Sequence, residues 1–375
     1  MDERYGTSEM DFFDEYFQRM LWQAYEMARK GKRKTEDEHR FELNEAENIL
    51  QLRDDIISKT YEPSRGIAFI TKEPVIREIF AAPFRDRVVH HFLFNVCNGW
   101  WDRHLIYDSY SCRAGKGTLF GIQRLHHHMQ SCSNNFKIPS YIIKLDIRAF
   151  FMSLNREKVL ERINWGLDRQ FRGNYGRLYN TVKYLWEKVI LDNPANGVKI
   201  RGKITDWDEL PRQKSLFNQP DGVGIVIGNL TSQLASNIYL DQLDRFCTRD
   251  LGFKHYGRYV DDFYIIVTED QYKYALDCIP VIEGFLDTLG LTLHPDKRYI
   301  QPIKHGVPFL GAMIYPYCIV PGKRMRKSFE TAALEFENGQ GDISTVVSYL
   351  GMMTKFKSKK IENEIFDRLG WDFVF

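Results

Sequence analysis

The sequence predicts an α+β fold, because strand patterns and helical patterns alternate irregularly along the chain. Residues 141–147 and 255–267 are short apolar runs with the β-branched and aromatic content of strands. Residues 11–30 and 231–251 instead repeat apolar side chains at helical spacing. No glycine-rich loop of the G-x-G-x-x-G or Walker type separates a strand from a helix, which disfavours a Rossmann or P-loop fold.

The N-terminal part of the chain is predicted to be helical on either side of a strand pair. After the helix at residues 11–30 and a charged segment, a second helix is expected across residues 41–56. β-Branched and aromatic residues from 66 to 79 predict two strands, broken at Lys72-Glu73-Pro74. Helical periodicity resumes at residues 85–101.

The middle of the chain continues from the strand at 141–147. A helix is expected to begin near Asn155, because asparagine is a favourable N-cap. Residues 192–224 are rich in Pro, Gly, Asn and Asp and are predicted to be largely loop. The helix at 231–251 then leads to two short strands that flank the pair Asp261-Asp262.

The C-terminal part contains three further elements. A helix is predicted at residues 275–289 and a strand or hairpin at 307–320. Beyond Pro321 the composition turns basic and helical, which predicts a separate small lobe.

Composition sets the outer limits of the interpretation. A chain of 375 residues suffices for two or three lobes, and a net charge of +2 gives no whole-chain indication of nucleic-acid binding. Six scattered cysteines without a C-x-x-C pair argue against a zinc ribbon or a disulfide framework. The acidic N-terminus does not resemble a signal peptide, and no apolar run reaches the roughly 20 residues that span a bilayer. We therefore expect a cytoplasmic protein without a membrane partner.

Three carboxylates carry the strongest chemical signal. A lone pair such as Asp261-Asp262 is also common in exposed hairpin turns. Asp146, however, ends a second apolar strand, and three carboxylates from two neighbouring strands can hold two Mg²⁺ ions about 4 Å apart. Such a pair of ions activates a hydroxyl nucleophile and neutralises a triphosphate.

The order of motifs resembles that of reverse transcriptases. The segments that carry the resemblance are IREIFAAPFRDRVVHH, SYSCRAGKGTLFGI, KLDIRAFF, GNLTSQLASNIYL, YVDDFYIIV, LHPDK and FLG. They extend from about Arg65 to Gly311. The resemblance implies a right-hand polymerase fold with an antiparallel palm sheet. Its parts are an N-terminal helical region (1–64), fingers (65–140, with part of 155–225 as a fingers/palm insertion), palm (141–320) and a short helical thumb (321–375).

The resemblance also implies roles around the carboxylates. Asp146, Asp261 and Asp262 match the metal-binding carboxylates. Ile147, the residue after Asp146, is assigned to both the metal site and the nucleotide site. Phe151 matches the bulky side chain that excludes a ribose 2′-hydroxyl, with core packing assigned instead to Phe150. Two Mg²⁺ ions are the implied cofactor, and Mn²⁺ could substitute.

Further residues match the parts that bind substrates. Lys297 corresponds to a general acid that protonates pyrophosphate, with a solvated lysine as the alternative. Lys72 and Arg77 lie near the finger residues that clamp the triphosphate. Phe309-Leu310-Gly311 resembles the primer grip. Basic residues beyond it are expected to contact the template–primer backbone, namely Lys323, Arg324 and Arg326.

One departure narrows the family. Where most reverse transcriptases carry Gln-Gly and then Ser-Pro, this chain has Ile227-Gly228 and then Ser232-Gln233. This form resembles the reverse transcriptases of diversity-generating retroelements, which copy a template-repeat RNA into cDNA with errors at adenines. The implied partners are template RNA, a primer, deoxynucleoside triphosphates and a basic, oligomeric accessory variability protein. Ile227 removes a polar contact at the nascent base pair, which predicts low fidelity, unless it is an ordinary apolar residue before a glycine turn.

Several alternatives stay open. A retron enzyme is expected to carry the Ser-Pro form. An abortive-infection enzyme is expected to have degraded motifs or long helical extensions, and a group II intron enzyme is expected to have a maturase or nuclease extension. A viral RNA polymerase is expected to carry Gly-Asp-Asp and a small gate residue. A non-catalytic RNA-binding scaffold has no need of all three carboxylates.

Overall fold

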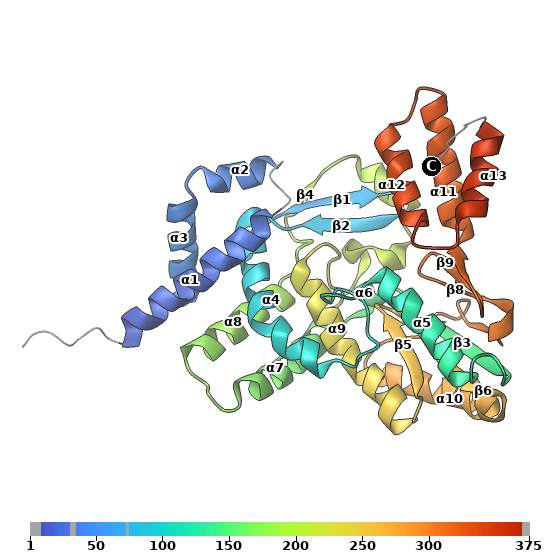
Figure 1. Cartoon of the computed structure of the whole chain (residues 1–375). Coiled ribbons are helices and arrows are strands. Elements are labelled where there is room, and N and C mark those ends of the chain that lie inside the picture. Colours follow the sequence, from blue (N-terminus) through green and yellow to red (C-terminus); the bar gives the residue numbers. More distant parts are fainter. Residues whose placement is uncertain (1–8, 31–34, 73–74, 370–375) are drawn as a thin grey trace, which may run out of the picture. The chain divides into compact units, whose positions relative to one another are not determined.

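The computed structural model describes residues 9–30, 35–72 and 75–369 (Figure 1). These residues divide into two compact units. Unit 1 comprises the described residues up to Ile106, together with Ile147–Leu243 and Phe285–Thr292. Unit 2 comprises Tyr107–Asp146, Asp244–Gly284 and the described residues from Leu293. Helices and mostly antiparallel strands are mixed in both, so the α+β prediction is confirmed.

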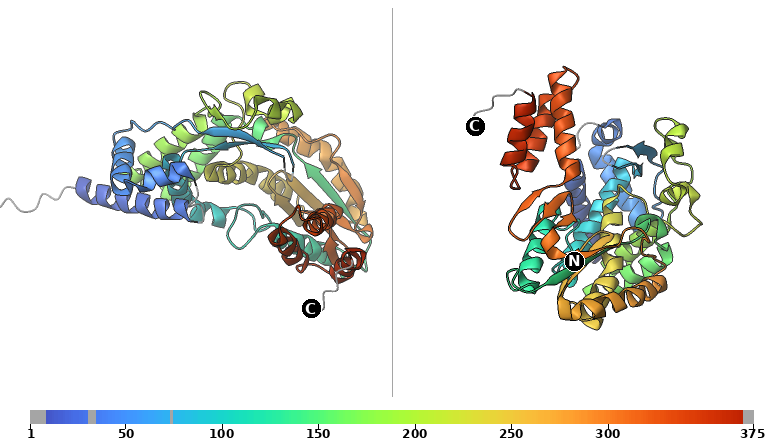
Figure 2. Two further views of the ribbon diagram at one scale, coloured as in Figure 1. Left: turned by 90° about the horizontal axis from the view of Figure 1, so that it is seen from above. Right: turned by 90° about the vertical axis from the view of Figure 1, so that its right-hand side faces the viewer.

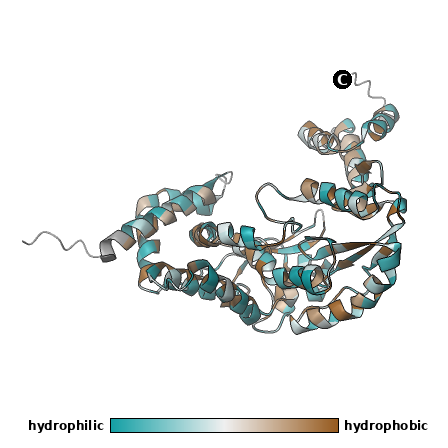
Figure 3. Cartoon of the chain, turned by 60° about the horizontal axis from the view of Figure 1, so that its bottom comes forward, coloured by the Kyte–Doolittle hydropathy of each residue, from teal (hydrophilic) through white to brown (hydrophobic). Residues whose placement is uncertain are grey.

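The helices alternate hydrophilic and hydrophobic residues along their length (Figure 3). Accordingly, no described helix is both long and apolar enough to cross a membrane.

Unit 1 is mainly helical, and α1 packs along α4 while α7 packs along α8. Its helices are α1 (Glu9–Arg29), α2 (Glu36–Glu42), α3 (Glu45–Ile57), α4 (Phe84–His104), α6 (Phe150–Ser153), α7 (Arg156–Phe171), α8 (Arg177–Leu191) and most of α9 (Leu230–Arg245). The predicted N-cap of α7 is confirmed, because the Asn155 side chain accepts a hydrogen bond from the Lys158 amide at 3.0 Å. Helix α8 was not predicted.

A small sheet in unit 1 has the order β2-β1-β4. Strands β1 (Ile67–Thr71) and β2 (Arg77–Ala81) pair antiparallel, as predicted, and β4 (Lys199–Ile200) pairs parallel to β1. The predicted loop at 192–224 contains, besides β4, three short 3₁₀ turns. These are η1 (Ile204–Glu209), η2 (Arg212–Lys214) and η3 (Leu216–Asn218).

Unit 2 is built on a four-stranded antiparallel sheet of order β5-β6-β3-β7. Its strands are β3 (Ser140–Asp146), β5 (His255–Tyr259), β6 (Asp262–Thr268) and β7 (Tyr299–Pro302). Helix α5 (Thr118–Cys132), which was not predicted, packs against β5 and β6, and α10 (Glu269–Thr288) follows β6 directly.

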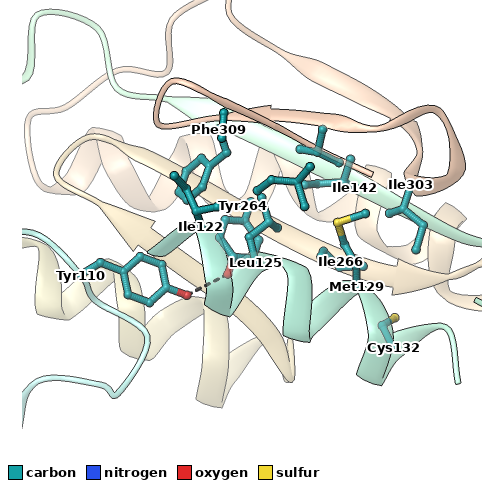
Figure 4. Packing of buried hydrophobic residues seen from close by; sticks show 13 residues of the cluster. Tyr110, Ile122, Leu125, Met129, Cys132, Ile142, Tyr264, Ile266, Ile303 and Phe309 are labelled. Carbon is teal, nitrogen blue, oxygen red and sulfur yellow. Dashed lines mark hydrogen bonds between the residues drawn. The ribbon is translucent and has the colours of Figure 1, made fainter. Parts of the chain in front are cut away.

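The core between α5 and this sheet contains a buried polar contact (Figure 4). Tyr110 and Tyr264 are fully buried, and their hydroxyls lie 2.8 Å apart. The ring of Phe309 packs edge-on against Tyr264 at 5.4 Å, and His128 Nδ1 lies 3.1 Å from the Tyr264 hydroxyl. These contacts fix the strand that begins with Asp262.

The close approach of the tyrosines requires a glycine on β5. A Cβ on Gly257 would lie 2.3 Å from the Tyr110 hydroxyl and 2.5 Å from that of Tyr264. We therefore expect Gly257→Ala to lower the free energy of unfolding by about 1–3 kcal/mol, measured by urea denaturation. The matched control is Gly284→Ala, because that position has open space and lies within a helix. Equal stability of the two variants would contradict the prediction.

The C-terminal part of unit 2 contains the predicted hairpin and the predicted helices. Residues 307–320 form the hairpin of β8 (Val307–Phe309) and β9 (Ala312–Ile314), extended by β10 (Ile319–Pro321). Three helices then pack around Phe329, Val346 and Met353, and lie side by side in Figures 1 and 2. They are α11 (Lys323–Glu337), α12 (Ile343–Met353) and α13 (Lys359–Leu369).

Candidate active site

Two neighbouring strands of unit 2 bring the three carboxylates together. Asp146 is the last residue of β3, Asp262 is the first residue of β6, and the two residues are register partners. Asp261 lies in the turn between β5 and β6. The prediction that two adjacent strands deliver these side chains is confirmed.

The turn that carries the acid pair has an unfavourable backbone. Val260 has φ +56°, a left-handed conformation that is costly for a β-branched residue. The Arg258 guanidinium donates a 2.9 Å hydrogen bond to the Val260 carbonyl oxygen. It also binds both carboxylate oxygens of Asp244 at 2.6 and 2.7 Å, and both side chains are fully buried. The buried Arg258–Asp244 pair thus holds the turn at Val260 in place.

Burial and mutual repulsion oppose ionisation of the acid pair. Burial, followed by the charge of Asp146, raises the pKa of Asp261 to about 6. Burial also raises the pKa of Asp262, an effect that the Lys144 ammonium partly offsets. The Oδ1 atom of Asp262 is buried and has no hydrogen-bond partner within the described part of the chain. The site therefore holds more negative charge than its protein partners satisfy.

Two lysines contact the carboxylates. Lys297 Nζ lies 2.9 and 3.0 Å from the two oxygens of Asp146. Lys144 Nζ lies 3.1 Å from Asp262 Oδ2 and 3.2 Å from the Pro308 carbonyl oxygen. The sequence interpretation missed Lys144. Lys144 lies two residues before Asp146 on the same strand, so strand alternation would have placed both side chains on one face of the sheet.

The carboxylates supply the oxygen ligands of a divalent-cation site, but in this conformation they are not arranged as a complete one. Among residues 9–30, 35–72 and 75–369, no three acidic, histidine or cysteine side chains converge as a ready-made metal cage. The lysine ammoniums instead balance Asp146 and Asp262 in this conformation. Carboxylate oxygens are the ligands that Mg²⁺ prefers, and the unpartnered Asp262 oxygen is an available one. Asp146, Asp261 and Asp262 are thus the residues that would hold such an ion.

Unit 1 brings together the residues predicted to contact the nucleotide sugar and base. Phe151 and Ile227 pack against one apolar cluster, which includes Phe80 and Leu216. Phe150 is buried at 2% exposure, in keeping with its predicted core role, and Ile147 is buried at 1%.

The loop that contains Ile227 is fixed against β2. The Phe80 amide donates to the Ile227 carbonyl oxygen at 3.2 Å. Gly228 has φ +128°, and a Cβ there would lie 2.9 Å from the Phe80 carbonyl oxygen. Only glycine fits this approach without strain. Gln233 follows in the first turn of α9.

The predicted triphosphate and primer residues are exposed or lie in turns, except Phe309, which is buried at the end of β8. Lys72 is exposed and pairs with Glu209 Oε1 at 2.8 Å, and Arg77 is exposed at the start of β2. Leu310 and Gly311 have φ +48° and +85° and form the tight turn expected between β8 and β9. The basic residues of the first turns of α11 are exposed, namely Lys323, Arg324 and Arg326.

The raised pKa of Asp261 predicts pH-dependent cation binding. Below about pH 6 the Asp261 carboxyl of the metal-free protein is protonated, so protons compete with the cation. We expect the apparent Mg²⁺ affinity to fall about tenfold for each pH unit below that value and to level off above about pH 7. Calorimetric titration across this range is the measurement. An affinity that stays constant from about pH 5 to about pH 7 would contradict the prediction.

No protein-family model and no curated protein sequence matches the chain. Among solved structures, it is similar to telomerase from Candida albicans in complex with a TWJ fragment of telomeric RNA, with a TM-score of 0.48 and 12% identity. The match covers 87% of this chain and 61% of that telomerase chain. The chain therefore spans less than two thirds of the telomerase chain that it matches.

Proposed function

We propose that the chain is an RNA-directed DNA polymerase of the reverse transcriptase type. The observation that carries the proposal is the register pairing of Asp146 with Asp262, with Asp261 in the adjoining turn. Seven motifs in reverse transcriptase order surround these residues in the sequence. We assign residues 65–140, with part of 155–225, as fingers, 141–320 as palm and 321–375 as thumb.

The residues of the site have separate tasks in this proposal. Two bound Mg²⁺ ions would supply activation of the primer 3′-hydroxyl and neutralisation of the triphosphate. Asp146, Asp261 and Asp262 would hold them, and Lys297, whose ammonium binds Asp146, would donate a proton to pyrophosphate. Lys144 supports Asp262 and links it to the Pro308 carbonyl beside the primer-grip turn.

We further propose that the enzyme belongs to a diversity-generating retroelement. Ile227, Gly228 and Gln233 support this subtype, because they replace the usual Gln-Gly and Ser-Pro residues. In this proposal the protein acts in the cytoplasm on a template-repeat RNA, with a basic accessory variability protein as partner. Retron, abortive-infection and group II intron enzymes of ordinary fidelity are the alternative.

Primer extension tests the proposed activity. The purified chain is incubated with an RNA template, a primer, Mg²⁺ and deoxynucleotides, and the cDNA is sequenced. We expect product with errors concentrated at template adenines. Faithful product would support the alternative enzymes. Absence of product, even with an accessory protein and structured RNA, would support a non-catalytic scaffold.

Fidelity is expected to depend on residue 227. Ile227→Gln restores a polar side chain where most reverse transcriptases have one, so we expect errors at adenines to fall by about tenfold. The matched control is Ile227→Leu, which keeps the position apolar and is expected to leave the error spectrum unchanged. If the Gln variant kept the wild-type error spectrum, the prediction that Ile227 lowers fidelity would be wrong. Packing against the apolar cluster would then be enough to explain why residue 227 is an isoleucine.

A further inference from the structure

We propose that the buried carboxylate of Glu78 is a positioning residue for nucleotide selection. It fixes the loop at residues 204–219 against the cluster that contains Phe151 and Ile227. This inference rests on the proposed function and deepens it, because it assigns a determinant of specificity outside the predicted motif residues.

Glu78 lies on β2 and is 1% exposed. Its Oε1 atom accepts hydrogen bonds from Trp207 Nε1 and Ser215 Oγ, both at 2.7 Å. Its Oε2 atom accepts from the Leu216 amide at 2.6 Å. Three donors from one loop, 129 to 138 residues away in the sequence, thus converge on a single side chain of the sheet.

The loop places apolar side chains on the proposed nucleotide residues. Leu216 is 4% exposed and shares a cluster with Phe80, and Trp207, Phe151 and Ile227 pack against that cluster. Because the Leu216 amide is one of the three donors to Glu78, the tether and the packing involve the same residue. The position of the loop therefore determines what lies behind Phe151 and Ile227.

The chain that follows the loop is fixed to the segment of Phe151 and to Arg156. The Ile225 amide donates to the Phe151 carbonyl oxygen at 2.8 Å. The Arg156 guanidinium donates to the Gly224 carbonyl oxygen at 2.8 Å. Glu78 thus holds the loop to the sheet at Trp207 and again at Ser215 and Leu216, and the chain segment that follows the loop is itself fixed.

Substitution of Glu78 by glutamine changes the hydrogen bonding of the side chain without changing its size. Glu78→Gln keeps the volume but replaces one acceptor oxygen with a donor, which then faces the Trp207 or Leu216 N–H group. A buried donor without an acceptor destabilises the closed loop. The carboxylates of unit 2 do not change, so the chemical step itself is expected to persist.

Two readouts test the inference on the full chain. The first is trypsin cleavage after the exposed residues Arg212 and Lys214, which we expect to be about tenfold faster in Glu78→Gln. The second is the ratio of kcat/KM for deoxynucleotide over ribonucleotide, which we expect to fall about tenfold. The kcat for the correct deoxynucleotide is expected to stay within about twofold, because the effect falls on KM and selection.

Matched variants keep the test informative. Asp208→Asn changes an exposed acid of the same loop and is expected to match the wild type in both readouts. Ser215→Ala removes one donor only and is expected to give a smaller change in the same direction, which covers the case that Glu78→Gln unfolds. Unchanged cleavage, or faster cleavage with unchanged selection, would overturn the role of Glu78 while polymerisation stands. A wild-type chain that makes no DNA would overturn the proposed function and, with it, the role of Glu78 in selection.

Discussion

Asp261→Asn is expected to abolish DNA synthesis and, in the absence of metal, to make the protein more stable. The pKa of Asp261 is raised to about 6, mainly by burial and then by Asp146. The folded state therefore holds a proton on this group more tightly than the unfolded state, whose carboxyl has a pKa near 3.9. The stabilising contribution is present in full below about pH 4 and is lost as the pH rises through about 6.

At neutral pH the metal-free wild type thus bears the whole cost of this buried charge. Asparagine removes the charge at nearly constant volume, so we expect the free energy of unfolding to rise by about 1–3 kcal/mol. Activity is expected to fall roughly a thousandfold or more, since about 4 kcal/mol of charge stabilisation corresponds to that factor.

Thermal unfolding with and without Mg²⁺ separates the two effects. Mg²⁺ is expected to raise the melting temperature of the wild type and to have little effect on Asp261→Asn. Asp277→Asn is the matched control, because Asp277 is exposed on α10, away from the site. A destabilised Asp261→Asn protein would contradict the prediction that the site holds an uncompensated charge.

The parts of the site that could be predicted from the sequence rest on local signals. Strands β3 and β6 were predicted from their apolar runs, and the carboxylates of Asp146 and Asp262 lie at the ends of these strands. The N-cap Asn155 and the turn at Leu310-Gly311 were likewise visible, because capping and tight turns depend on a few adjacent residues.

The parts that were missed depend on contacts between distant residues. Glu78 is an ordinary alternating residue of β2 until the loop at residues 204–219 supplies its donors. Arg258 and Asp244 are 14 residues apart, one on a strand and one in a helix, and their ion pair has no sequence motif.

Helix α5 was missed although the sequence carried a signal for it, because Ile122, Leu125 and Met129 follow helical spacing and face the core.

Asp244→Ala is expected to be among the most destabilising single changes in unit 2. It leaves the Arg258 guanidinium, which is fully buried, without its bidentate partner. Breaking a buried pair from one side costs about 3–5 kcal/mol, because the remaining charge cannot be solvated. Urea denaturation is the measurement. The control is Glu36→Ala, whose partner Arg40 is exposed, so the loss is expected to be at most about 1 kcal/mol.

The double variant Asp244→Leu, Arg258→Met shows what the pair does for the active site. Replacing both partners with apolar side chains is expected to recover part of the stability, because no buried charge remains, although the buried Tyr256 hydroxyl loses Asp244 as its acceptor. It does not restore the hydrogen bond to the Val260 carbonyl oxygen, so the strained turn loses its support. We therefore expect a folded protein with weakened Mg²⁺ binding, measured by calorimetry. A double variant that binds Mg²⁺ like the wild type would show that the pair stabilises unit 2 without positioning Asp261 and Asp262.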